Sequence, residues 1–192
     1  MQAPRRRDSQ YEEIRGEVQL QAGLSIERIL SRCGSACEVL IVLMIAQDST
    51  LGMKSGREAD SLYGLSDRLR VRRRASGLRS LRDDEVLLFG CFDPRLNAVV
   101  NVACCVTRKH FWSRDKMFRS FAKLNGILAR NEERGRAEEL RGRQERGQAP
   151  IKEVYIMSDE LYCPRDKWLS ARDLYSVTKN IFRLQNAKIT VC

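Results

Sequence analysis

Five arginines fall within a run of seven residues that reads Arg68-Leu-Arg-Val-Arg-Arg-Arg74. They are Arg68, Arg70, Arg72, Arg73 and Arg74. Guanidinium groups at this density bind phosphate oxygens by charge and paired hydrogen bonds, and a basic run is also typical of a nuclear-import signal. A solvated charged face is the simpler alternative. Because no aromatic residue is interleaved, the run does not indicate stacking on single-stranded bases.

The composition of the whole chain also favours an acidic partner. Its 192 residues include 35 Lys and Arg against 25 Asp and Glu, which gives a formal net charge of +10 and a pI near 9.6. Nucleic acid is the commonest partner of a basic protein, although a ribosome-like or membrane-surface protein has a similar balance.

The residues that could perform catalysis form no recognisable arrangement. His110 follows Arg108 and Lys109, which favours a basic surface over a nucleophilic triad. The chain has neither the Gly-x-x-x-x-Gly-Lys loop nor the Gly-x-Gly-x-x-Gly fingerprint. We therefore expect a binding function, with no catalytic residue and no cofactor.

The cysteines do not indicate a metal site. The nearest approach to a zinc knuckle is Cys33-Gly-Ser-Ala-Cys37, and His110 is the only histidine. We expect reduced, intracellular thiols packed as small apolar side chains. The seven are Cys33, Cys37, Cys91, Cys104, Cys105, Cys163 and Cys192.

The apolar segments place the chain outside the membrane. Residues 1–23 read as a basic flexible arm with no apolar stretch behind it, so they do not form a secretory signal. The longest apolar run, Val39 to Ala46, is far shorter than the roughly 20 residues of a membrane-spanning helix. We expect a protein that is not secreted and has no membrane partner.

Periodicity then predicts the elements that must position these residues. Ser25 can cap a helix whose apolar positions run from Ile26 to Met44 at i, i+3, i+4 spacing. The other expected elements are a hairpin of strands 85–92 and 98–106, a helix from Ser113 with a charged insertion at 130–149, a strand at 151–157, a helix to about Asn186 and a strand at 188–192.

Together these elements predict an α/β fold, with α+β as the alternative. A helical segment with an arginine-rich linker would occupy residues 24–82, and a ββαβαβ core with a mixed sheet would occupy 83–192. The closing strand-helix-strand unit implies a parallel right-handed crossover.

This order of elements is similar to the core of restriction-type nucleases. In those enzymes two carboxylates hold a divalent metal beside a water that a lysine polarises. Asp83, Asp84 and Asp93 could supply one carboxylate, but the strand from Leu96 to Val106 contains no acid. A degenerate or magnesium-dependent nuclease is therefore the last of three hypotheses.

Three segments carry a second resemblance: DEVLLFGCFDPRLNAVVNV, VYIMSDELYCPRDKW and the closing Ile189-Thr-Val-Cys192. They resemble the N-terminal jaw domain of the fifth shared subunit of eukaryotic-type DNA-directed RNA polymerases. Cys163-Pro164-Arg165-Asp166 replaces that family's Thr-Pro-Ser-Ala motif. The sequence also stops where the jaw domain stops, without the C-terminal assembly module, which suggests a divergent version such as a large DNA virus could encode.

The resemblance implies the first hypothesis, a non-catalytic polymerase subunit that contacts downstream duplex DNA. Pro164, Arg165 and Lys167 would lie against the phosphate backbone at a helix N-terminus. It also implies larger RNA polymerase subunits, or another protein complex, as partners, and a location in the nucleus or at a viral replication site. The second hypothesis is a protein–protein adaptor or viral accessory protein on a nuclease-like fold without catalytic residues. Alternatively, Pro164 simply starts a helix that Trp168 anchors.

Overall fold

The computed structural model describes residues 17–21, 23–35, 38–46, 64–75, 81–82, 84–107, 114–140, 151–158, 171–182 and 187–192. They form four helices and six strands within these ranges. In chain order the elements are β1 (Val18–Leu20), α1 (Ile26–Arg32), β2 (Val39–Ala46), α2 (Leu65–Ala75), β3 (Val86–Asp93), β4 (Ala98–Thr107), α3 (Arg114–Leu140), β5 (Glu153–Ile156), α4 (Ala171–Ile181) and β6 (Lys188–Val191).

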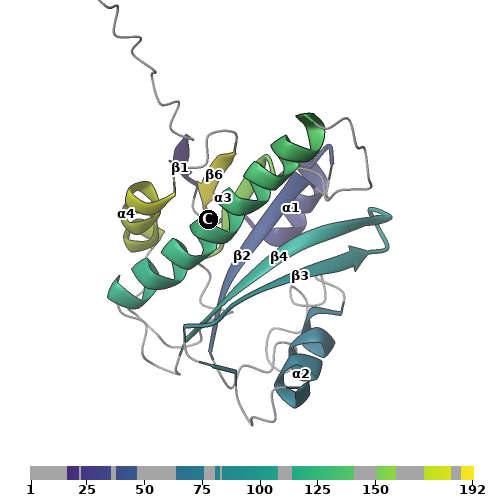
Figure 1. Cartoon of the computed structure of the whole chain (residues 1–192), viewed down its shortest axis with the longest axis horizontal. Coiled ribbons are helices and arrows are strands. Elements are labelled where there is room, and N and C mark those ends of the chain that lie inside the picture. Colours follow the sequence, from purple (N-terminus) through teal and green to yellow (C-terminus); the bar gives the residue numbers. More distant parts are fainter. Residues whose placement is uncertain are drawn as a thin grey trace, which may run out of the picture.

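The six strands make one mixed sheet in the order β1-β6-β5-β2-β4-β3. All neighbouring strands are parallel except β3 and β4, which form an antiparallel hairpin. This confirms the predicted α/β class, the mixed sheet and the ββαβαβ order from β3 onward. Figure 1 shows the hairpin at the side of the sheet opposite β1.

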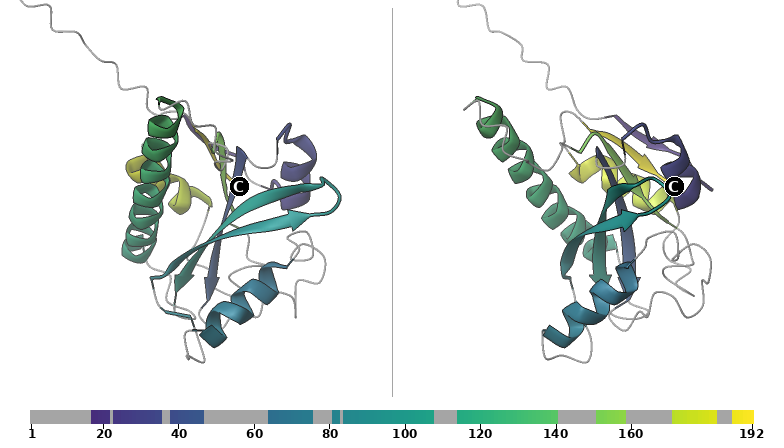
Figure 2. Two further views of the ribbon diagram at one scale, coloured as in Figure 1. Left: turned by 45° about the vertical axis from the view of Figure 1, so that its right-hand side comes forward. Right: turned by 90° about the vertical axis from the view of Figure 1, so that its right-hand side faces the viewer.

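Helices cover both faces of the sheet. Helices α1 and α2 pack on one face through Ile26, Ile29, Leu65 and Leu69. Helices α3 and α4 pack on the other, where the rings of Phe121 in α3 and Phe182 after α4 lie 5.5 Å apart. The two views of Figure 2 show this arrangement of helix, sheet and helix layers.

Strand β2 lies in the middle of the sheet, and its side chains alternate between the two cores. Leu40, Val42 and Met44 face α3 and α4, whereas the residues between them face α1 and α2. A central parallel strand covered on both faces reads as an unbroken apolar run, because every position is buried.

The predicted helix from Ile26 to Met44 is therefore wrong beyond Arg32, where α1 ends. Ser25 does cap α1, since its Oγ accepts a hydrogen bond from the Arg28 amide at 3.3 Å. The second half of the predicted helix is β2. An unbroken apolar run satisfies helical spacing as well as strand spacing, so its periodicity could not separate the two.

Two further elements differ from the expectation. Val18–Leu20, within the expected flexible arm, pair with β6 as strand β1, and the arginine-rich run lies in helix α2. Helix α3 extends through the first part of the charged insertion to Leu140, and residues 141–149 lie outside the described residues. Among the described helices, none is long and apolar enough to span a membrane.

Candidate functional site

The chain leaves two neighbouring strands in opposite directions. After β2 it continues to α2, on the same face as α1. After β5 it continues to α4, on the opposite face. In open α/β sheets, ligands bind outside the carboxyl ends of the strands at such a switch in direction. The carboxyl ends of β2 and β5 are therefore the candidate site.

The sheet has a step at this position, because β5 ends opposite Val42 whereas β2 continues to Ala46. The last residue of β5, Ile156, pairs with Val42, and the amide of Met157 donates to the Val42 carbonyl at 3.0 Å. The next residue, Ser158, turns to β6, where its amide and hydroxyl both donate to the Cys192 carbonyl.

Strand β2 continues four residues further, to Ala46, which pairs with Thr107 of β4. Within the described residues no strand pairs with the β5 side of positions 43–46. The connections 47–63 and 159–170 that leave this step lie outside the described residues.

The arginines of α2 lie at the same end of the sheet, where the parallel strands have their carboxyl ends. Arg72 Nη2 lies 2.9 Å from Glu85 Oε1, and the Glu85 carbonyl accepts a hydrogen bond from the Val106 amide at 2.8 Å, near the carboxyl end of β4. Figure 2 shows α2 at the end of the sheet to which the β2 arrow points. Helix α2 thus brings positive charge to the edge that carries the candidate site.

Helix α2 contains five arginines and one acid, Asp67, so its own net charge is +4 (five minus one). Asp67 Oδ1 lies 3.3 Å from Arg70 Nη1, with both side chains largely exposed. The arginines therefore keep most of their charge available to an anion in solvent.

Helix α3 is tied to the same edge by a charged side chain. Lys123 Nζ donates to the Asp84 carbonyl at 2.8 Å, and Asp84 has a φ of 61°, in the left-handed region that aspartate tolerates. Asp84 Oδ1 and Ser120 Oγ are buried and have no hydrogen-bond partner among the described residues. Buried polar atoms are usually satisfied, so these two are candidate contacts for a water or a polar ligand atom.

The carboxylates considered for a nuclease do not meet. Asp84 lies two residues before the start of β3 and Asp93 is its last residue, so nine residue steps, roughly 30 Å at 3.3 Å per residue, separate them. Asp83 lies outside the described residues. The described part of the chain contains no group of three His, Cys, Asp or Glu that could hold a metal ion.

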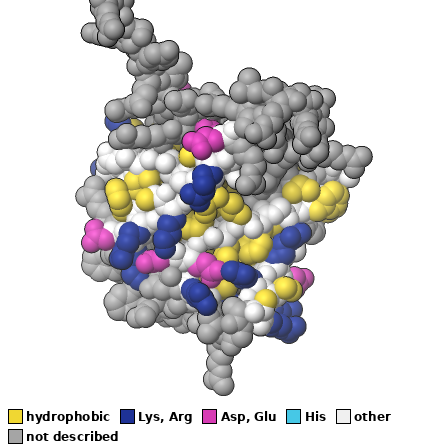
Figure 3. Space-filling model, viewed as in Figure 1, with side chains coloured by type: hydrophobic (Ala, Val, Ile, Leu, Met, Phe, Trp, Pro, Cys, Tyr) yellow, Lys and Arg dark blue, Asp and Glu magenta, His cyan; other side chains and the backbone are white. Residues whose placement is uncertain are grey.

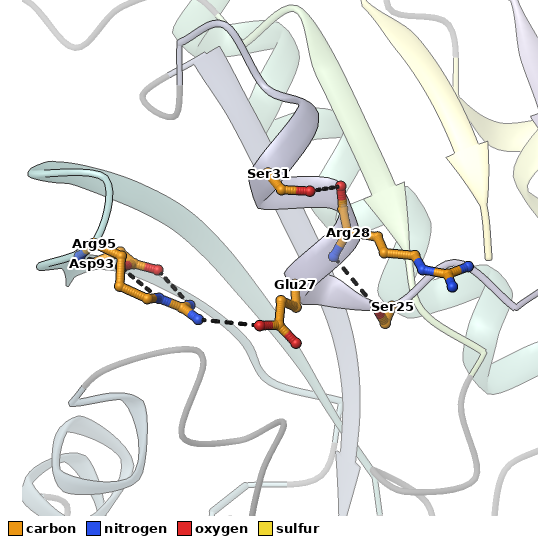
Figure 4. A network of polar contacts seen from close by, with 6 residues as sticks. All are labelled: Ser25, Glu27, Arg28, Ser31, Asp93 and Arg95. Atoms are coloured by element: carbon orange, nitrogen blue, oxygen red, sulfur yellow. Dashed lines mark hydrogen bonds and ion pairs between the residues drawn. The ribbon is translucent and has the colours of Figure 1, made fainter.

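Asp93 instead belongs to a structural network at the far end of the hairpin. It is buried, and its carboxylate accepts hydrogen bonds from the backbone and guanidinium of Arg95. Arg95 Nη1 also lies 3.7 Å from Glu27 Oε1 of α1, as Figure 4 shows. These contacts tie the β3–β4 turn to the start of α1.

Five cysteines lie as free thiols within the described residues, and the predicted packing as small apolar side chains is confirmed for the four that are buried. Four are buried: Cys91, Cys104, Cys105 and Cys192. Burial raises the pKa of Cys105 and of Cys192 to about 12. These thiols stay protonated near neutral pH, which suits packing and not nucleophilic chemistry.

The predicted phosphate-contacting residues divide into two groups. Helix α2 brings the five arginines from Arg68 to Arg74 together. Pro164, Arg165 and Lys167 lie outside the described residues, in the connection between β5 and α4. A contact of either group with DNA phosphates stays a prediction.

The step beside β2 was missed because its strand was predicted to be a helix.

Comparison with known proteins identifies the fold. No protein-family model and no curated protein sequence matches the chain. Among solved structures, it is similar to a mutant of the Oceanobacillus iheyensis macrodomain, with 10% sequence identity, a TM-score of 0.52 and coverage of 91% of this chain and 81% of that one. The macrodomain of Thermus aquaticus DarG gives 11% identity, a TM-score of 0.48 and coverage of 92% and 97%. The first likeness shows a macrodomain-like fold, and no more than the fold.

This finding corrects the RNA polymerase resemblance, which is wrong. That resemblance depended on a strand pair joined by Asp-Pro and on a strand followed by a proline, and both patterns suit many α/β sheets. The assignment to transcription as a polymerase subunit falls with it. Nothing in the structure shows DNA binding or a nuclear location. The adaptor alternative assumed a nuclease-like fold and is likewise unsupported.

Proposed function

We propose that this chain binds a phosphate-bearing nucleotide at the carboxyl ends of β2 and β5, and that ADP-ribose is the first ligand to test. The observation that carries the proposal is the switch in chain direction between β2 and β5, where the sheet is stepped. The macrodomain-like fold supports the choice of ligand.

The arginines of α2 have the chemistry to hold the ligand's phosphates. A guanidinium group remains charged at any ordinary pH and presents paired donors that match two phosphate oxygens. Helix α2 is anchored beside the carboxyl end of β4 by the Arg72–Glu85 ion pair, so the remaining arginines can approach an anion at that edge. The formal charge of +10 adds a long-range attraction for a polyanionic ligand.

The segment after β5 supplies a second basic group for the proposal. Arg165 and Lys167 belong to the connection that begins at the carboxyl end of β5. We propose both as further phosphate contacts, because that connection follows directly on the strand that ends at the candidate site.

Isothermal titration of the full chain with ADP-ribose tests the proposal, with AMP and ribose 5-phosphate as smaller comparators. The two variants are Arg70→Glu and Arg74→Glu, and the matched control is Arg32→Glu at the exposed end of α1, away from the site. We expect both α2 variants to weaken binding by about tenfold, which is about 1.4 kcal/mol, and the control to weaken it far less. Absence of binding at millimolar ADP-ribose, or equal weakening by all three variants, contradicts the proposal.

A further inference from the structure

Strand β3 forms an open edge of the sheet. It pairs with β4 on one side only, and no described segment pairs with its other side. An exposed edge strand carries a row of backbone donors and acceptors that can pair with another chain.

Backbone amide and carbonyl groups alternate in direction along β3, which decides which residues can pair with a second strand at the open edge. The Val106 amide donates to the Glu85 carbonyl, so Leu87 and every second residue after it direct their backbone groups toward β4. The alternate residues, which include Leu88, Gly90 and Phe92, therefore direct their amide and carbonyl groups to the open edge.

The same alternate positions present an apolar surface on the face covered by α3 and α4. Leu88 is 42% exposed and Phe92 is 50% exposed, and Val99 of β4, opposite Phe92, is 45% exposed. Figure 3 shows hydrophobic side chains exposed on the side of the molecule where Figure 1 shows the hairpin. Outer edges usually carry charges that prevent pairing, and these positions carry none.

Gly90 gives this surface its shape. A Cβ built on Gly90 would lie 2.9 Å from Val99 Cγ1, so the Val99 side chain occupies the space above the glycine. The exposed face of β3 thus has one large apolar side chain on each side of Gly90, at equal spacing.

We propose that β3 pairs antiparallel with β3 of a second copy of this chain, about a twofold axis at Gly90. In this register Leu88 of one copy lies opposite Phe92 of the other, twice, and Gly90 lies opposite Gly90. Opposite residues of an antiparallel pair share a face, so the four exposed side chains cover one another. The three residue pairs supply about six backbone hydrogen bonds.

The neighbouring registers are poorer. A shift of the axis by one residue in one direction places Leu88 opposite Gly90, and a shift in the other places Leu88 opposite Pro94, which has no amide to donate. Of these three registers, only the Gly90-centred one places Leu88 against Phe92. It also places Glu85 of one copy opposite Arg95 of the other, so that opposite charges meet, each of which already has a partner within its own copy.

A second copy suits this surface because the pattern complements itself under twofold rotation. Isologous twofold pairing is the commonest symmetry of soluble oligomers. The predicted result is a continuous sheet of twelve strands, twice the six of one copy.

Sedimentation velocity of the full chain, from about 10 µM to about 500 µM, covers the range expected for a modest interface. We expect the mass to rise from 22.1 kDa toward twice that value. Phe92→Lys places a charge on the edge and should keep the protein monomeric. The matched control is Phe118→Lys on α3, where Phe118 is 51% exposed, and it should leave dimer formation unchanged.

Specific cross-linking tests the register independently. Leu88→Cys and Phe92→Cys chains are mixed and oxidised, and the linked peptides are identified by mass spectrometry. Opposite residues in a hydrogen-bonded pair have Cα atoms about 5.5 Å apart, within disulfide reach, whereas Leu88 of one copy lies roughly 13 Å from Leu88 of the other. We expect the mixed link and little Leu88→Cys homodimer.

Three results would overturn the proposal. The first is a wild-type protein that stays monomeric throughout the concentration range. The second is an equal effect of Phe92→Lys and Phe118→Lys, which would indicate general hydrophobic association. The third is a Leu88→Cys homodimer link that forms as readily as the mixed link.

Discussion

The carboxylate of Asp93 accepts two hydrogen bonds from the guanidinium of Arg95, at 2.9 Å and 3.2 Å, where β3 ends. Asp93 is only 2% exposed, so its charge depends on this partner. The side-chain hydrogen bonds from Arg95 lower the pKa of Asp93, and its burial acts in the opposite direction. This pair fixes the β3–β4 turn, in which Asn97 adopts a φ of 48°.

Replacing Asp93 with Asn should therefore reduce the free energy of unfolding by about 1–3 kcal/mol near neutral pH. Because the folded-state pKa of Asp93 is lowered, its contribution is present above about pH 4, the ordinary value for Asp. That contribution is lost as the pH falls through the folded-state pKa. Urea unfolding of both proteins at pH 7 and at lower pH measures the difference, and a difference that grows on acidification would refute this account of Asp93.

The contact between α3 and α4 gives a second prediction. Phe121 is completely buried and its ring lies 5.5 Å from that of Phe182. Phe121→Ala should cost about 3–5 kcal/mol, since it removes a large core side chain and leaves a cavity. Phe118→Ala on the exposed side of the same helix should change stability by less than about 0.5 kcal/mol. Denaturant unfolding compares the two variants, and similar losses of stability would contradict the assignment of Phe121 to the buried face of α3 and Phe118 to its exposed face.

The thiols give a third prediction. Burial, with a smaller contribution from Glu153, raises the pKa of Cys33 to about 11, and burial raises the pKa of Cys104 well above its ordinary value. Iodoacetamide at mildly alkaline pH should leave Cys104 and Cys105 unmodified in the folded protein, while urea should expose both. Site-resolved mass spectrometry measures the labelling. Fast modification of either thiol without denaturant would contradict their place in the core.

The buried thiols of Cys105 and Cys192 predict a loss of stability in alkali. A raised folded-state pKa favours the protonated thiol, so its contribution to stability is complete below the ordinary thiol pKa of 9.0 and falls as the pH rises toward about 12. Thermal unfolding of the wild type and of Cys105→Ala across this range tests the effect. A wild type that loses no more stability in alkali than the variant would count against it.

Ionic strength supplies the next prediction, for the proposed nucleotide site. If exposed arginines of α2 attract the ligand's phosphates, added salt should weaken ADP-ribose binding, because charges in solvent are screened over about 8–10 Å at physiological salt. Titrations at low and high sodium chloride measure the dependence. Arg70→Glu should flatten it, whereas Arg32→Glu should leave its slope close to that of the wild type. An affinity independent of salt would remove α2 from the site.

The sequence was sufficient for the part of the fold made by local patterns. The hairpin of β3 and β4 was predicted because two β-rich apolar runs flank Asp93 and Asn97, which favour a turn. The order of elements from β3 to β6 followed in the same way. The helical stripe of α3 was visible because Phe121 and Leu124 recur at helical spacing among polar residues.

What the sequence could not provide was long-range pairing. Val39 to Ala46 is a strand because β4 and β5 lie on its two sides, and neither neighbour is visible from the run itself. The candidate site depends on that strand, because the step beside Leu43 results from the pairing of β5 with only the first half of β2. The arginines were identified as candidates from charge, but only the fold places them at the carboxyl edge.

The most direct test is a titration of the isotope-labelled full chain with ADP-ribose, followed by backbone amide NMR. The proposed function predicts the largest shift changes at Met44 to Ala46 and at Met157 and Ser158, beside the step between β2 and β5. It predicts the smallest changes at Leu96 and Asn97, in the turn at the opposite edge of the sheet. No change at millimolar ADP-ribose, or changes centred on that turn, would contradict it.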